Sequence, residues 1–71
     1  MFDAETLMKL NVGDIIEAPP LLPGISSENV VIKVSDTLVN GFLFDAYYFN
    51  VWVCDFTAKI DTKGALVWTL V

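Results

Sequence analysis

The stretch FLFDAYYFNVWVCDF, residues 42 to 56, carries seven of the chain's nine aromatic residues and only two charged ones. Aromatic and β-branched residues favour strands. Asp45, Asn50 and Asp55 interrupt the stretch before it reaches the roughly 18 apolar residues that a membrane-spanning helix needs. We therefore interpret it as β-structure that forms a core, a surface that meets a partner, or both.

A clear turn follows this stretch. The segment DTKG at residues 61 to 64 is typical of a type I turn followed by a glycine bulge. It predicts three cross-strand pairs: Ile60 with Leu66, Ala58 with Trp68, and Phe56 with Leu70. Because side chains alternate across a strand, the even positions then share one face, which we take as the core face. Its expected members are Trp52, Cys54, Phe56, Ala58, Ile60, Leu66, Trp68 and Leu70.

Asn40-Gly41 indicates a second hairpin whose register can be argued from charge. A two-residue turn there would place Asp36 opposite Asp45, and a like-charge cross-strand pair costs stability. A three-residue loop with Gly41 at the bulge avoids this pair, and we predict that register. The two-residue turn would be acceptable only if a divalent cation bridged Asp36 and Asp45 and so offset their repulsion. The predicted register aligns Ile32, Val34 and Leu38 with Phe42, Phe44, Ala46 and Tyr48.

The sequence does not define the strand boundary near Asn50. No glycine or proline marks a turn near Asn50, so this region is either a tight turn or one long bent strand.

Asp3 is a suitable cap for a helix over residues 4 to 10. Residues 14 to 18 are expected to form a first strand, and the three prolines of APPLLPGISS, residues 18 to 27, predict a loop whose leucines cap an open end of the fold.

The segment LNVGDIIEA, residues 10 to 18, resembles the opening strand of small SH3-like barrels, which often begin with an apolar-x-Gly-Asp-apolar-apolar pattern. The long loop and hairpins that follow are similar too. The resemblance implies a mainly β fold: a four- to five-stranded antiparallel SH3-like barrel or curled sheet with a short N-terminal helix. It implies no particular function. Peptide-binding members carry aromatic and acidic residues in the loop after the first strand, whereas this loop contains prolines and no aromatic residue.

Length and composition exclude several classes of function. We expect residues 1 to 71 to form one domain, whose small core is strengthened by an apolar content of 55%. One cysteine and no histidine rule out a disulfide framework, a Cys/His metal site and a histidine general base. We therefore expect no enzyme activity, cofactor or metal, and Cys54 is interpreted as a small core residue. The N-terminus lacks the pattern of a secretion signal, which indicates a cytoplasmic protein without a membrane segment.

The charge balance disfavours direct binding to nucleic acid. Nine acidic residues face four lysines, there is no arginine, and the net charge is −5. Neutralising phosphates depends on lysine and arginine. The acidity is suited to a partner with a basic surface, and it also keeps so apolar a chain in solution. Small size, acidity and the lack of catalytic groups resemble phage or mobile-element accessory proteins, many of which bind and inhibit a host protein.

The face opposite the core carries more apolar residues than a solvated face needs. Three explanations are open: the N-terminal helix covers it, the chain self-associates through it, or another protein binds it. We predict a protein-binding module, with a self-assembling virion or scaffold subunit as the alternative and an acidic mimic of nucleic acid as a third possibility. The expected partner-binding residues are Leu43, Asp45, Tyr47, Phe49, Val51, Val53 and Asp55.

Overall fold

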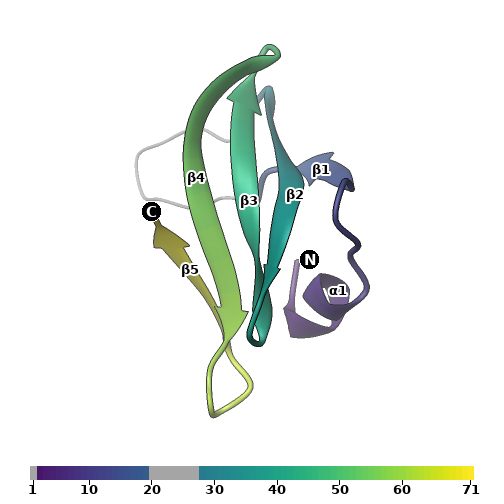
Figure 1. Cartoon of the computed structure of the whole chain (residues 1–71), viewed down its shortest axis with the longest axis vertical. Coiled ribbons are helices and arrows are strands. Elements are labelled where there is room, and N and C mark those ends of the chain that lie inside the picture. Colours follow the sequence, from purple (N-terminus) through teal and green to yellow (C-terminus); the bar gives the residue numbers. More distant parts are fainter. Residues whose placement is uncertain (1, 20–27) are drawn as a thin grey trace.

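The computed structural model of the chain describes residues 2 to 19 and 28 to 71, which form one helix and five strands. These are α1 (Ala4–Met8), β1 (Ile15–Glu17), β2 (Val30–Leu38), β3 (Gly41–Tyr48), β4 (Val51–Ile60) and β5 (Leu66–Leu70). The strands make a single antiparallel sheet in chain order (Figure 1). The mainly β prediction is confirmed. In the part described, β1 and β5 remain separate edges, so the sheet is open and not a closed barrel.

The hairpin of β4 and β5 has the predicted register. Phe56, Ala58 and Ile60 lie opposite Leu70, Trp68 and Leu66. The Asp61 amide donates to the Ala65 carbonyl at 2.9 Å, and Gly64 takes a φ of +82° that few other residues adopt. The Asp61 carboxylate also accepts from the amides of Lys63 and Ala65, each at 2.9 Å. This turn is fixed by its own residues.

The predicted register of the β2–β3 hairpin is wrong. Leu38 lies opposite Gly41, so the loop has two residues, and the bulge falls within β2 between Val34 and Asp36. Gly41 belongs to the strand, because a Cβ there would collide with the Ala58 carbonyl of β4. Asp36 consequently lies opposite Leu43, away from Asp45. The bulge restores the alternation, so Val34 still shares a face with Phe44 as expected.

A two-residue turn at Phe49 and Asn50 joins β3 to β4 and settles the open boundary. Both residues have positive φ, +47° and +65°, as a type I′ turn requires. A bulge follows in β4: Ala46 pairs with Cys54 and Tyr47 pairs with Trp52, which leaves Val53 without a partner on β3. This turn forms the tip at the upper end of the sheet in Figure 1.

The helix α1 packs on the core face. Leu7 is fully buried in one cluster with sheet residues, and the Phe2 ring lies 5.4 Å from that of Trp68. The prediction that Trp68 faces the core is confirmed, and the possibility that the helix covers the opposite face is excluded. The buried core of the described residues is Leu7, Ala18, Ile32, Val34, Phe44, Ala46, Phe56 and Ala58.

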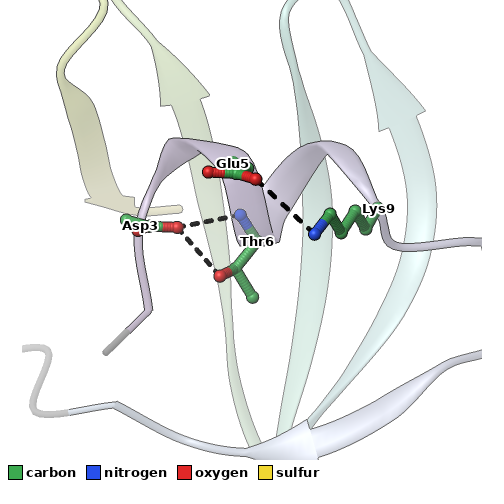
Figure 2. A network of polar contacts seen from close by, with 4 residues as sticks. All are labelled: Asp3, Glu5, Thr6 and Lys9. Carbon is green, nitrogen blue, oxygen red and sulfur yellow. Dashed lines mark hydrogen bonds and ion pairs between the residues drawn. The ribbon is translucent and has the colours of Figure 1, made fainter.

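Polar side chains in α1 and at its two ends form hydrogen bonds and an ion pair that stabilise the helix (Figure 2). The Asp3 carboxylate accepts hydrogen bonds from the Thr6 amide at 2.9 Å and the Thr6 hydroxyl at 2.8 Å. Lys9 pairs with Glu5 one turn away at 3.6 Å. The predicted cap is confirmed. Among the described residues, this short helix is the only one, and no helix there has the length and apolar character to cross a membrane.

Replacing Leu7 by alanine should cost about 2–5 kcal/mol of the free energy of unfolding, because Leu7 is fully buried where the helix meets the sheet. Chemical denaturation followed by tryptophan fluorescence measures this loss. The control is Met8→Ala on the exposed side of the same helix, which should change stability by less than about 0.5 kcal/mol. Equal losses in the two variants would contradict the packing described here.

Candidate protein-binding surface

The outer face is the side of the sheet away from α1. None of its side chains is buried, whereas the central residues of the core face are almost completely buried. Of the described elements, none packs over it. Its side chains come from all five strands, as strand alternation and the register define them: Ile15, Glu17, Val31, Lys33, Asp36, Leu38, Leu43, Asp45, Tyr47, Trp52, Asp55, Thr57, Lys59, Val67 and Thr69. Leu38 was predicted on the core face, but the bulge in β2 moves it to the outer face, opposite Gly41.

Two aspartates lie directly opposite each other at the centre of the outer face. Asp45 of β3 pairs with Asp55 of β4. The Asp55 carbonyl accepts from the Val71 amide at 3.1 Å, on the side away from β3. The two aspartates therefore form a non-hydrogen-bonded pair, in which Cα atoms are only about 4.5 Å apart. The predicted register avoids a pair of Asp36 with Asp45, but a like-charge pair does occur, between Asp45 and Asp55.

The environment of this pair raises the pKa of Asp45. Its partial burial has the largest effect, followed by a hydrogen bond to Asp55 and repulsion from the Asp55 charge. Lys33, opposite Asp45 on β2, and the Tyr47 side chain act in the other direction but do not reverse the shift. Lys9 forms an ion pair with Glu5, and no lysine of the described residues lies within 4 Å of either aspartate carboxylate.

Trp52 lies beside the aspartates, although the sequence placed it in the core. The unpaired Val53 shifts the alternation, so that Trp52 and Asp55, three residues apart, share the outer face. The Trp52 Nε1 group donates to Asp55 Oδ1 at 2.9 Å, and the side chain is 57% exposed. Tyr47 lies opposite Trp52. The two aromatic rings and the two carboxylates thus occupy neighbouring positions on adjacent strands.

The tip of the β3–β4 hairpin carries a second exposed aromatic group. Phe49 is 64% exposed, and its ring meets that of Tyr48 edge-on with centroids 4.6 Å apart. Its φ of +47° lies in the left-handed region, which bulky residues rarely adopt. Strained backbone of this kind is found most often at functional sites. Phe49 contributes little to the core, which makes it a candidate contact residue.

The seven predicted contact residues are therefore only partly brought together. Four share the outer face: Leu43, Asp45, Tyr47 and Asp55. Phe49 occupies the turn and Val53 the bulge, both exposed. Val51 pairs with Tyr48 and shares its side of the sheet, so its predicted place on the outer face is wrong. Trp52 was missed, because nothing in the local sequence marks the bulge.

Cys54 and the acidic side chains are the groups of the described residues to consider for catalysis and metal binding. Burial, and then the Asp55 charge, raise the pKa of the Cys54 thiol, so it stays protonated at neutral pH and is a poor nucleophile. No group of three or more potential metal ligands occurs in the part of the chain described. A hollow of about 470 Å³ beside Phe49 is open to solvent and has a mixed polar and apolar lining. The outer face is a broad surface of exposed and half-buried side chains.

Comparison with protein-family models, with curated proteins and with solved structures finds no match. The function therefore has to be inferred from the chain's own residues and geometry.

Replacing Asp55 by asparagine should raise the melting temperature at about pH 7, by the few degrees that correspond to about 0.2–1 kcal/mol in a domain of this size. The change removes the repulsion of Asp45 but keeps an oxygen that can accept from Trp52. A raised pKa in the folded state means that ionised Asp45 opposes folding, and this penalty disappears as the pH falls through that pKa. The difference from wild type should therefore shrink as the pH falls toward about 4.

Thermal unfolding of both proteins between about pH 3 and pH 8 measures this difference. A melting temperature that falls in the variant at neutral pH, or an increase that is independent of pH, would contradict repulsion between the two carboxylates.

Replacing Phe49 by asparagine should leave the free energy of unfolding within about 1 kcal/mol of wild type. The loss of the contact with Tyr48 costs about 0.5–1.5 kcal/mol, but asparagine adopts positive φ more readily, and the relief of strain is of similar size. Urea denaturation provides the measurement. A fall of more than about 2 kcal/mol would mean that the Phe49 ring supports the fold and is not available for contact.

Proposed function

We propose that this protein is a non-enzymatic protein-binding module that docks another protein on the outer face and the adjoining hairpin tip. The observation that carries the proposal is that the outer face bears half-buried and exposed apolar and aromatic side chains with no described element over it. Exposed apolar side chains that gather on one surface often mark a site of protein–protein contact.

The distribution of aromatic residues supports docking. Tyr47 and Trp52 lie together on the outer face, and Phe49 projects at the tip that continues it. Tyrosine and tryptophan are the residues that most often dominate binding energy at interfaces. A standard interface buries about 800 Å² on each partner, which is compatible with one face of a five-stranded sheet.

The proposed biological role is that of a small acidic modulator or inhibitor that binds a cellular protein, as phage accessory proteins of this kind do. The net charge of −5 is suited to a partner with a basic surface. The lone, protonated Cys54 is compatible with a reducing compartment such as the cytoplasm.

A second candidate, self-assembly into a structural subunit, is favoured by the edges of the sheet. Among the described strands, β5 pairs only with β4. It lies along residues 56 to 60 of β4, so no described strand pairs with the β4 segment 51 to 54 on that side. Unpaired edges are templates for adding strands from another copy. The bulge at Val53 interrupts this edge, and the net negative charge of each copy opposes association.

Affinity capture from the native host with matched variants tests the proposed function. A Tyr47→Ser, Phe49→Ser double variant should lose most of the partner that wild type retains, because both side chains are assigned to the interface. The control is Val39→Ser in the turn between β2 and β3, at the other end of β3 from Phe49. It removes an apolar side chain that is 83% exposed and should leave capture unchanged. Unchanged capture by a folded double variant would refute the proposal.

A further inference from the structure

We infer that the partner places a cationic side chain, most suitably an arginine, on the pair formed by Asp45 and Asp55. This inference deepens the proposed function and rests on it. The pair can bind a cationic side chain of the partner only if the partner docks on the outer face.

The first step is the negative charge of the pair, which Lys33 offsets only in part, because it lies opposite Asp45 on β2 but forms no ion pair with it within 4 Å. Asp45 and Asp55 face each other across a close cross-strand position, and in the described residues no lysine lies within 4 Å of either. Like charges directly opposite each other destabilise a sheet. Local rules of this kind are broken mostly where function requires it. A cation between the carboxylates would convert the repulsion into attraction.

The second step is the setting of the pair. Leu43 and Tyr47 flank Asp45 along the same face of β3, and Trp52 donates its indole N–H to Asp55. Once a partner covers this face, the carboxylates lose water, and only a compensating charge prevents a large desolvation cost. The partner surface must therefore be apolar around a single cation, complementary to the aromatic and carboxylate groups on the outer face.

The third step favours arginine over lysine and a different protein over a second copy. A guanidinium group is planar, binds carboxylates through two parallel hydrogen bonds and stacks on aromatic rings, which suits two carboxylates beside Trp52 and Tyr47. The chain contains no arginine, so another copy cannot supply this group.

The test is an NMR titration of the isotope-labelled full chain with N-acetyl-arginine amide. The Trp52 indole N–H, bonded to Asp55, is the reporter, and the indole of Trp68 on the core face is the internal control. The Trp52 signal should shift in a saturable manner while that of Trp68 stays in place. The neutral isostere N-acetyl-citrulline amide should bind at least tenfold more weakly, and N-acetyl-lysine amide should lie between the two.

A double variant, Asp45→Asn with Asp55→Asn, keeps the size and hydrogen-bonding capacity of both side chains and should lose the response to the arginine probe by at least tenfold. An equal response to citrulline, or an undiminished response in the double variant, would overturn the inference. Sedimentation showing a tight homodimer that protects the Trp52 indole would also overturn it, because a second copy would then occupy the face.

The outcomes separate this inference from the proposed function. Capture that depends on Tyr47 and Phe49 but not on the two aspartates would retain the docking surface and remove the cation. Capture that depends on none of the four residues would refute both.

Discussion

The structure depends on the burial of Leu7 against the sheet. Leu7 joins α1 to Ile32, Val34 and Phe44, and all four side chains are fully buried. The described chain has only one short helix to place over its sheet. A sheet with one helical layer has one dry face, and the apolar residues on its other side remain in contact with water. Within the described residues, the outer face is thus the side of the sheet that α1 leaves uncovered.

The bulge at Val53 decides which residues that face presents. Without it, Trp52 would alternate onto the core side, where Phe44 and Trp68 already pack with centroids 5.5 Å apart. With it, the indole lies beside Asp55 and next to Tyr47. One extra residue in β4 therefore produces the association of aromatic and acidic groups on which the proposed function rests. Bulges often redirect side chains near functional sites in this way.

The sequence predicted elements whose signals are local, and it failed where tertiary packing decides. The β4–β5 pairs followed from the chemistry of Asp61 and Gly64, and the helix cap followed from Asp3. The β2–β3 register failed because Gly41 is required by contact with Ala58, which is distant in sequence, and not by a turn. The bulges and the turn at Phe49 carry no glycine or other marker. Asp45 and Asp55 were predicted to be contact residues, but their direct pairing could only be found from the β3–β4 register.

The central claim is that the outer face is open to solvent in the free protein and becomes covered when a partner binds. The most direct measurement is paramagnetic relaxation by a neutral, soluble relaxation agent, recorded on the isolated chain by NMR. The Trp52 indole and the Tyr47 ring should be broadened strongly, while Leu7 and Phe44 should be protected. Protection of Trp52 and Tyr47 comparable to that of Leu7 would show that the face is already covered and would contradict the account.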